Sequence, residues 1–395
     1  MRILMVHNKY GALSGEDVVV SNIVKLLREQ GHEVYCFFRS SEEILGSFRL
    51  KAKAFFSGIY SFTSKKAIRR ILAEQKPDVV HVHNLYPLIS PSILSECSHS
   101  GLPVVMTAHN YRLICPNGLF MTGGKTCEKC SGGREYWCVL RNCVKSLFKN
   151  VGYALRNYVA RRKRFYIDNV TIYAALTQFQ RQRLIQEGYP GDRICVLPNM
   201  AGVSEMNVSA ELGNYVSYIG RVSPEKGIST FIEAARLCCN IQFKIAGLNV
   251  RMPDVSREAL SNLEFCGHLK ANQLDEFYRN SRIVILPSIC YETFGLTLAE
   301  AALWGKPVIC SRIGGLPEIV EDGVTGLLFQ PGNAHDLQAK VSYLWERPEL
   351  CEKMGQAGRE KALCEYSAQK YYKSLMATYE KALQLAQANY RQNVA

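Results

Sequence analysis

Short apolar runs alternate with helix-length amphipathic segments along most of this chain, and the alternation begins twice. The first series predicts strands at residues 2–7, 33–38, 79–83, 104–108, 171–176 and 193–197, with helices that include 17–31, 91–98 and 178–187. The second series predicts strands at 215–219, 243–246, 263–266, 283–286 and 308–311. Strands that alternate with helices form a parallel sheet with right-handed crossovers. We therefore predict an α/β protein with two Rossmann-like parallel-sheet domains.

The length of 395 residues also favours two domains over one core. We place the first domain at 1–200, a polar linker at 201–214 and the second domain at 215–366. Helical periodicity continues through 367–395, and the sequence leaves open whether this last helix crosses back to the first domain. Two domains joined by a hinge would face each other across a cleft, which is a preferred place for ligands.

Charge is unevenly divided between the two halves. Residues 1–200 carry 28 Lys and Arg against 14 Asp and Glu, whereas residues 201–395 carry 20 against 21. A basic half indicates an anionic partner. An acidic saccharide, a lipid-linked phosphate and an anionic membrane surface all have the required charge. Nucleic acid has it too, but no nucleic-acid recognition module accompanies the charge, so we expect no nucleic-acid partner.

The opening residues MRILMVHNKYG have the pattern of a short buried strand. Their apolar run is too short for a signal peptide, and no small-residue cleavage site follows it. The chain also has no apolar run of about eighteen residues that could span a membrane. Fifteen cysteines without a secretion signal favour reduced thiols. These features predict a cytoplasmic protein.

Two acidic side chains follow the predicted strand at 283–286. Gly295 is expected to begin a helix, which places Glu292 in the loop before the helix and Glu300 within it. Free N–H groups at a helix N-terminus bind phosphate or sugar oxygens. A carboxylate, which only accepts hydrogen bonds, suits a pair of hydroxyls such as a ribose diol. Taken alone, the same spacing also fits an ordinary strand–loop–helix unit.

The sequence GRVSPEKG, residues 220–227, joins another strand to a helix and carries Arg221 and Lys226. A guanidinium and an ammonium at such a turn can hold a diphosphate. The alternative is a pair of solvated surface charges. The predicted topology places them at the same sheet edge as Glu292 and Glu300, which favours phosphate binding.

In this order, the motifs resemble the retaining, nucleotide-sugar-dependent glycosyltransferases of family 4, glycosyl transferase group 1. The resemblance covers nearly the whole chain through SGED, TAHN, TQFQRQRL, VLPN, GRVSPEKG, ETFGLTLAEA and GGLPEIVEDGVTGLLF. It implies the GT-B fold and transfer of a hexose from a UDP- or GDP-sugar to a saccharide, with retention at the anomeric carbon. The expected acceptor is lipid-linked, in cell-surface polysaccharide biosynthesis. The alternatives are a sugar-nucleotide epimerase and a non-catalytic sugar-nucleotide-binding protein.

The resemblance also implies roles for individual residues. Catalytic roles fall on His109, Glu292, Arg221 and Lys226, with the two cations neutralising the leaving diphosphate. The implied donor-binding residues are Gly15, Arg221, Lys226, Gly247, His268, Leu269, Glu292, Thr293, Phe294, Gly295 and Glu300. Among these, Glu300 would bind the ribose. Gly247, His268 and Leu269 would lie near the base. No Asp-x-Asp tripeptide is present, and no catalytic cofactor is expected. Relatives often have two glycines where this chain has Ser14 and Gly15.

Five cysteines lie between residues 115 and 143. The Cys-x-x-Cys pair with further cysteines nearby resembles a structural zinc knuckle, and if a metal binds, the expected ligands are Cys115, Cys127, Cys130 and Cys143, with Cys138 as an alternate ligand. Free or redox-active thiols are the alternative, because five cysteines compete for four places and only one Cys-x-x-Cys pair is present.

Residues 145–166 interleave Lys and Arg with Leu, Phe, Tyr and Val at helical spacing. This pattern is typical of an interfacial helix on an anionic membrane. A helix packed on the domain with a solvated basic face is the alternative. The first interpretation predicts peripheral association with the cytoplasmic face of a membrane.

Overall fold

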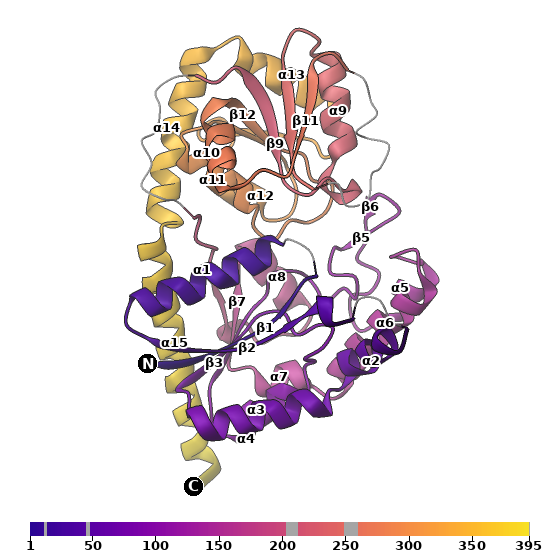
Figure 1. The fold of residues 1–395 in the computed structure, drawn as a ribbon, viewed down its shortest axis with the longest axis vertical. Coiled ribbons are helices and arrows are strands. Elements are labelled where there is room, and N and C mark those ends of the chain that lie inside the picture. The colour runs from indigo at the N-terminus through magenta and orange to yellow at the C-terminus, as the bar shows by residue number, and fades with distance from the viewer. Residues whose placement is uncertain (12–13, 45–47, 203–211, 249–259, 395) are drawn as a thin grey trace. The chain divides into compact units, whose positions relative to one another are not determined.

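The computed structural model describes residues 1–11, 14–44, 48–202, 212–248 and 260–394. These residues form two compact units (Figure 1). One contains Met1–Thr122, Cys127–Pro198 and Ala368–Ala395, and the other contains Gly123–Thr126 and Asn199–Ser367. Most of the predicted linker at 201–214 lies outside the described residues.

The first unit is built on a six-stranded sheet in the order β2-β1-β3-β4-β7-β8. The pairs within it are parallel. Every residue of β3, β4 and β7 is buried, as expected for parallel strands covered on both faces. The strands are β1 (Arg2–Lys9), β2 (Glu33–Ser40), β3 (Val79–Val82), β4 (Val104–Thr107), β7 (Ile172–Ala175) and β8 (Ile194–Val196). The chain between β4 and residue 126 adds two further short strands, β5 (Met121–Thr122) and β6 (Lys125–Thr126).

The helices of the first unit begin and end at the expected kinds of residue. Ser14 caps the first helix, because its side chain accepts a hydrogen bond from the N–H of Glu16. Gly31 follows that helix with a left-handed φ of 78°. The helices are α1 (Gly15–Glu29), η1 (Ser41–Ile44), α2 (Phe48–Ile59), α3 (Phe62–Gln75), α4 (Ile93–His99), α5 (Tyr136–Leu140), α6 (Leu147–Arg162), α7 (Phe165–Asn169), α8 (Gln178–Gln186), η2 (Gly191–Arg193) and α15 (Ala368–Val394).

The last helix, α15, packs against α1 and β4 within the first unit. The hydroxyl of Tyr379 lies 2.7 Å from Nδ1 of His81. Nearer the start of the helix, Tyr372 lies 2.9 Å from Nε2 of His32. These side-chain contacts join the last residues of the sequence to elements near its beginning.

The second unit also has a six-stranded sheet, in the order β11-β10-β9-β12-β13-β14. Its strands are β9 (Tyr215–Ile219), β10 (Phe243–Ala246), β11 (Leu263–Gly267), β12 (Ser281–Leu286), β13 (Val308–Ser311) and β14 (Gly326–Phe329). Its helices are η3 (Pro224–Lys226), α9 (Ile228–Leu237), α10 (Ala271–Asn280), α11 (Leu296–Leu303), α12 (Leu316–Ile319), α13 (Ala334–Trp345) and α14 (Pro348–Glu365). All described strand pairs in this sheet are parallel.

The predicted fold class is confirmed, since each unit is an α/β structure with a parallel sheet. Each predicted strand is present, with ends within two residues of the prediction. The elements that the sequence analysis missed include β14, the short strands β5 and β6, and the helices α2 and α3. Among the described residues, no helix combines the length and the apolar content that crossing a bilayer requires.

Candidate functional site

The predicted donor-binding residues of the second unit follow the carboxyl ends of its strands. At β9 and β10 the backbones approach closely, because a Cβ on Gly247 would lie 1.7 Å from the carbonyl oxygen of Gly220. The N–H of Gly220 donates to Ala246 at 2.9 Å, and the N–H of Val222 donates to Leu248 at 2.9 Å. This approach requires glycine at position 247, which has a φ of 152°.

Glu292 lies in the loop between β12 and α11 and is bonded to two side chains. Its Oε1 accepts hydrogen bonds from Lys226 Nζ at 2.6 Å and from Ser288 Oγ at 2.5 Å. Burial raises the pKa of Glu292, but the Lys226 ammonium and the Ser288 hydrogen bond outweigh burial and bring the pKa below its ordinary value. Lys226 and Glu292 therefore form a partly buried ion pair, although 66 residues separate them in the sequence.

The turn that carries Lys226 packs tightly against the end of β12. Gly227 has a left-handed φ of 70°, and a Cβ there would lie 1.8 Å from the carbonyl oxygen of Pro287. This contact brings Lys226 within reach of Glu292. Arg221, at the start of the same turn, has a side chain that is 51% exposed and lies 3.6 Å from the carboxylate of Glu225. An anion can therefore reach Arg221 from solvent.

Glu300 lies on α11, where the hydroxyl of Tyr278 donates to its Oε2 at 2.9 Å. The buried ring of Tyr278 stacks on Trp304 at 6.3 Å between centroids. Burial raises the pKa of Glu300 to about 7, against the smaller effect of the Tyr278 hydrogen bond. Without a ligand, this carboxyl group is therefore near the midpoint of its titration at neutral pH.

The remaining predicted residues of the second unit lie at the same sheet edge. Gly295 caps α11 with a left-handed φ of 87°. Phe294 is buried and makes an edge contact with Tyr366 at 5.2 Å. Thr293 lies in the same loop, whereas the exposed His268 and its neighbour Leu269 follow β11. The structure thus gathers these residues, and their roles in binding a donor stay predictions.

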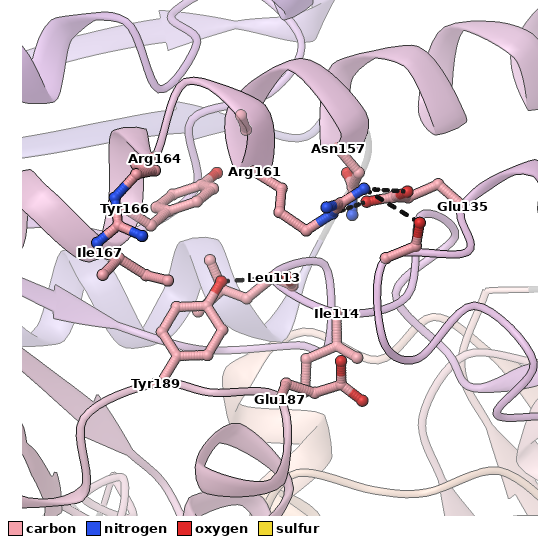
Figure 2. Close-up of a pocket in the computed structure, with 12 residues that line it drawn as sticks. Leu113, Ile114, Glu135, Asn157, Arg161, Arg164, Tyr166, Ile167, Glu187 and Tyr189 are labelled. Atoms are coloured by element: carbon pink, nitrogen blue, oxygen red, sulfur yellow. Dashed lines mark hydrogen bonds and ion pairs between the residues drawn. The ribbon is translucent and has the colours of Figure 1, made fainter.

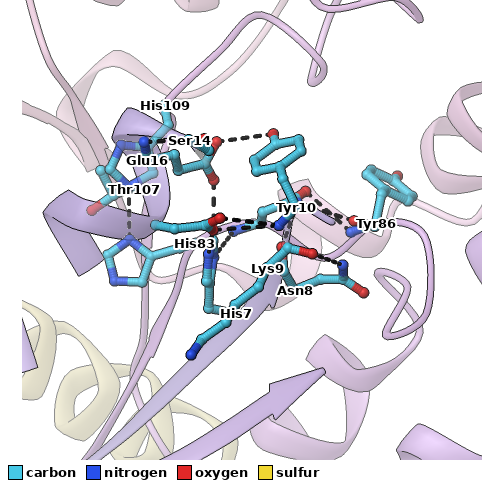
Figure 3. Close-up of polar contacts among 12 residues, drawn as sticks. His7, Asn8, Lys9, Tyr10, Ser14, Glu16, His83, Tyr86, Thr107 and His109 are labelled. Carbon is cyan, nitrogen blue, oxygen red and sulfur yellow. Dashed lines mark hydrogen bonds and ion pairs between the residues drawn. The ribbon is translucent and has the colours of Figure 1, made fainter. Parts of the chain in front are cut away.

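His109 follows β4 in the first unit and contacts a second histidine (Figure 3). Its Nε2 lies 2.8 Å from Nδ1 of His83, and the two rings stack at 5.1 Å. Burial lowers the pKa of His109 to about 3 and brings the pKa of His83 well below its usual value. Both rings are therefore neutral at pH 7, and a hydrogen bond between them couples their tautomers.

A polar network surrounds the N-terminus of α1 in the same unit (Figure 3). His7 Nε2 lies 2.6 Å from Asp17 Oδ1. The hydroxyl of Tyr10 donates to Glu16 Oε2 at 3.0 Å and accepts from Arg112 Nη1 at 2.9 Å. Burial raises the pKa of Glu16. A cavity of about 20 Å³ lies beside this network, with Glu16 and Arg112 among its lining residues.

The sequence analysis singled out His109 and missed the residues around it. A usable signal was present, because His7, His83 and His109 lie at or just after the carboxyl ends of β1, β3 and β4. These strands are neighbours in the sheet. Gly15 differs from Gly247, because no atom of the described residues lies within 4 Å of a Cβ at Gly15. Steric crowding by the described residues therefore does not explain why position 15 is a glycine.

The first unit has a second cavity, of about 50 Å³, and Figure 2 shows the residues that line it. Arg161 Nε donates to Glu135 at 2.7 Å beside it, and the hydroxyl of Tyr189 donates to the carbonyl oxygen of Leu113 at 3.2 Å. The Arg161 and Glu135 charges neutralise each other. None of the predicted site residues lines this cavity.

The clustered cysteines are free thiols. Cys130 and Cys138 are buried in a small apolar cluster against which Cys143 packs. Burial, with smaller effects of nearby Cys115, Cys143 and Cys127, raises the pKa of Cys130 to about 12. A hydrogen bond with Cys138 lowers the pKa of Cys143 below its ordinary value. Within the described part of the chain, no three His, Cys, Asp or Glu side chains form a group that could hold a metal ion. The zinc site stays a prediction.

Two family models match adjacent parts of the sequence. The model described as Glycosyltransferase Family 4 matches residues 13–203, and the model described as Glycosyl transferases group 1 matches residues 204–361. A relative from Klebsiella pneumoniae, the "uncharacterized 42.6 kDa protein in cps region", is 25% identical over 265 residues. This match covers 66% of the present chain and 64% of the relative, which is less than two thirds of the relative's length.

Solved structures share the fold at low sequence identity. Sucrose-phosphate synthase from Thermosynechococcus elongatus has a TM-score of 0.67 and 17% identity, covering 100% of this chain and 99% of that one. The Anabaena protein HepE, in complex with UDP and glucose, has a TM-score of 0.62 and 17% identity, covering 96% and 99%. Together with the two family models, which span residues 13–361, these similarities show that the chain belongs to the family 4 glycosyltransferases of the GT-B fold.

Proposed function

We propose that this protein transfers a hexose from a UDP- or GDP-sugar to a saccharide acceptor, with retention at the anomeric carbon. The charge arrangement at one sheet edge of the second unit is the observation on which the proposal depends. Arg221 is exposed there, while Lys226 and Glu292 form a partly buried ion pair. Cleavage of a sugar–phosphate bond develops negative charge on the leaving diphosphate, which nearby cations stabilise. The UDP and glucose bound to HepE support a UDP-sugar as donor.

In this proposal, different residues of the site bind the ribose, the transferred sugar and the diphosphate of the donor. Glu300, beside Tyr278, accepts hydrogen bonds from the ribose hydroxyls. Glu292 and the loop before α11 hold the transferred sugar, and Gly295 exposes the helix N-terminus to phosphate or sugar oxygens. Arg221 and the helix terminus neutralise the diphosphate without a catalytic metal ion.

A stripe of apolar side chains on α6 is the feature from which we infer the kind of acceptor. Leu147, Phe148, Val151, Leu155 and Tyr158 are 38–67% exposed. Steps of four, four and three residues from Leu147 to Tyr158 place these side chains on one face of the helix. Such a contiguous apolar face on a helix marks an interaction surface.

The opposite side of α6 is buried and carries polar residues. Arg156 Nη2 donates to the carbonyl oxygen of Pro116 at 2.7 Å, and Asn157 Nδ2 donates to that of Arg112 at 2.7 Å. The Arg156 guanidinium also lies 4.1 Å from the centre of the Tyr86 ring. Surface helices usually bury their apolar face. On α6 the apolar stripe is exposed and polar residues are buried instead. We infer that the stripe binds a partner outside this unit.

Charge and a neighbouring helix suggest what that partner is. Phe55 of α2 contacts Phe148 at 4.9 Å, and the adjacent Phe56 is exposed. Lys145 and Lys149 are exposed beside the stripe. Apolar side chains with flanking cations are typical of helices that lie in an anionic membrane interface. The acceptor in this proposal is therefore a lipid-linked saccharide of a cell-surface polysaccharide, reached from the cytoplasmic face.

Donor binding is tested by thermal unfolding of the full chain with a panel of UDP- and GDP-sugars. A ligand that binds the folded state raises the melting temperature. We expect a rise with one nucleotide class, and its loss in Arg221→Ala. Arg236→Ala is the matched control, because Arg236 is 48% exposed and also pairs with a glutamate. A rise that persists in Arg221→Ala contradicts the proposed site.

The reaction itself is tested by incubating the donor with lipid-linked saccharide extracts and determining the anomeric configuration of the product by NMR. An inverted product contradicts retention. An epimerised nucleotide sugar formed without acceptor favours the epimerase alternative, and tight donor binding without turnover favours the non-catalytic one.

Membrane binding is tested with vesicles of phosphatidylglycerol and phosphatidylcholine. Leu147→Asp should reduce sedimentation with the vesicles, and added salt should reduce it further. Leu363→Asp is the control, because Leu363 is an exposed leucine of α14 in the other unit. Equal binding by both variants and the wild type contradicts a membrane role for α6.

A further inference from the structure

The end of α5 brings two cysteines together through its backbone. Asn142 has a left-handed φ of 45°. Its N–H donates to the carbonyl oxygen of Val139 at 3.0 Å, and the N–H of Cys143 donates to that of Cys138 at 3.2 Å. These are the two hydrogen bonds of a Schellman motif, in which the second residue after the cap contacts the last helical turn. Here both contacting residues are cysteines.

A buried asparagine holds this turn in place. Asn150 Nδ2 donates to Asn142 Oδ1 at 2.6 Å, and Asn150 Oδ1 accepts from the N–H of Val144 at 3.1 Å. The thiol of Cys138 also lies 3.6 Å from Asn150 Oδ1. The side chain of Asn150 has no exposed surface. The pairing of the two cysteines is therefore built into a fixed turn.

The two thiols differ in their access to solvent. Cys138 is 1% exposed and lies in the apolar cluster with Cys130. Cys143 packs against this cluster and is half-buried. A small oxidant can reach Cys143, whereas Cys138 is shielded but adjacent. This is the arrangement of an attacked thiol and a resolving thiol.

We propose that Cys143 and Cys138 form a reversible disulfide on reaction with hydrogen peroxide. The Cys143 sulfur attacks one peroxide oxygen, so that an S–O bond forms, the O–O bond breaks and water leaves. Cys138 sulfur then attacks Cys143 sulfur, forming the S–S bond and breaking the S–O bond, and the hydroxyl departs as water with the Cys138 proton. Each disulfide thus reduces one peroxide to two waters. A dithiol reductant restores both thiols by exchange.

This site is independent of the proposed glycosyl transfer and competes with the predicted zinc site. Cys143 is one of the predicted ligands, with Cys138 as its alternate. A thiolate that coordinates zinc is not available to a peroxide. The metal content of the purified protein is therefore part of the test.

The experiment treats the reduced full chain with hydrogen peroxide, blocks remaining thiols and digests the protein with trypsin. Cleavage after Arg141 separates the two cysteines, so the disulfide links peptide 135–141 to peptide 142–145. We expect to detect this linked pair of peptides and to lose it after treatment with dithiothreitol. Elemental analysis should find zinc only at background level, on the order of a tenth of an equivalent per chain or less. This mapping uses the wild-type chain and needs no variant to fold.

Variants then assign the two roles. Cys138→Ser should leave a sulfenic acid at Cys143 that dimedone labels, whereas Cys143→Ser should leave Cys138 unlabelled. Cys239→Ser is the control, because Cys239 is an exposed cysteine of the second unit. Linkage of Cys143 to Cys127 or Cys130, labelling of Cys138 in Cys143→Ser, or one zinc per chain with unreactive thiols would each overturn the proposal.

Discussion

The partly buried carboxyl of Glu300 has a raised pKa, so its role in the donor site can be tested by measuring stability at different pH values. Burial raises its pKa from an ordinary value of 4.5 to about 7. Folding therefore favours the protonated form. Below pH 4.5 the group is protonated in both the folded and the unfolded state and has no effect on stability. As the pH rises from there to about 7, the unfolded chain ionises first, and the free energy of unfolding decreases.

The size of the effect follows from the shift. A pKa of about 7 in the folded protein against 4.5 in the unfolded chain corresponds to about 3 kcal/mol of destabilisation at pH 8, and to about 1 kcal/mol at pH 5. Glu300→Gln keeps an oxygen that can accept from Tyr278 but has no charge. We therefore expect Glu300→Gln to stabilise the second unit by about 3 kcal/mol at pH 8. For a cooperative unit of this size, that is a rise of roughly 6 to 12 °C in melting temperature.

The assay is scanning calorimetry of the wild type and Glu300→Gln at pH 5 and pH 8. Glu233→Gln is the control, because Glu233 is an exposed carboxylate of α9 in the same unit. The same change in melting temperature at both pH values refutes the argument from the raised pKa of Glu300. Donor affinity should fall in Glu300→Gln despite its greater stability. A more stable variant with unchanged donor affinity refutes the ribose assignment alone.

Two further predictions concern the same region: one tests the close packing at Gly227, and the other tests the pairing of Lys226 with Glu292. Gly227→Ala should destabilise the second unit by more than about 2 kcal/mol, because its Cβ would lie 1.8 Å from Pro287 oxygen. Gly323→Ala, also at a left-handed φ but with no described atom within 4 Å of the Cβ, should cost about 1 kcal/mol. Urea unfolding compares the two, and equal costs contradict the clash. Lys226→Met should lower the unfolding free energy by about 1–3 kcal/mol, because the partly buried Glu292 loses its cation and a hydrogen-bond donor. Adding Glu292→Gln should recover most of that loss, and no recovery contradicts the pairing.

Local pattern was sufficient to predict the fold class. The runs Val79–Val82 and Val308–Ser311 are apolar or small at every position except His81, and the structure buries all their residues. Only a sheet covered on both faces accommodates such strands. Gly31 and Gly295 were also predictable, because each follows or precedes a helix in a left-handed conformation that glycine adopts without strain.

One strand escaped prediction for a reason that lies in the tertiary structure. β14 is short and begins with Gly326, which has a low propensity for strands. A Cβ at that position would lie 2.2 Å from the carbonyl oxygen of Val308 in the neighbouring strand. Close packing between two strands accounts for this glycine, and no local pattern reveals that packing.

In the candidate site, too, local pattern predicted the position of each residue in the chain, whereas its contact partners depend on the tertiary structure. The sequence placed Lys226, Glu292 and Glu300 in loops and helices that follow parallel strands, and the structure has them there. Their partners depend on which strands are neighbours. Lys226 meets Glu292 because β9 lies beside β12, and Glu300 meets Tyr278 across α10 and α11.

By itself, the sequence determined the two parallel sheets, most of their strands and the helical region near residues 145–166. Periodicity and turn residues depend on neighbours within a few positions of the chain, so they can be read directly. The tertiary structure decided which face of α6 is buried and which histidines surround His109. Those choices depend on contacts between segments far apart in the sequence, such as Arg156 with Pro116, which local pattern does not encode.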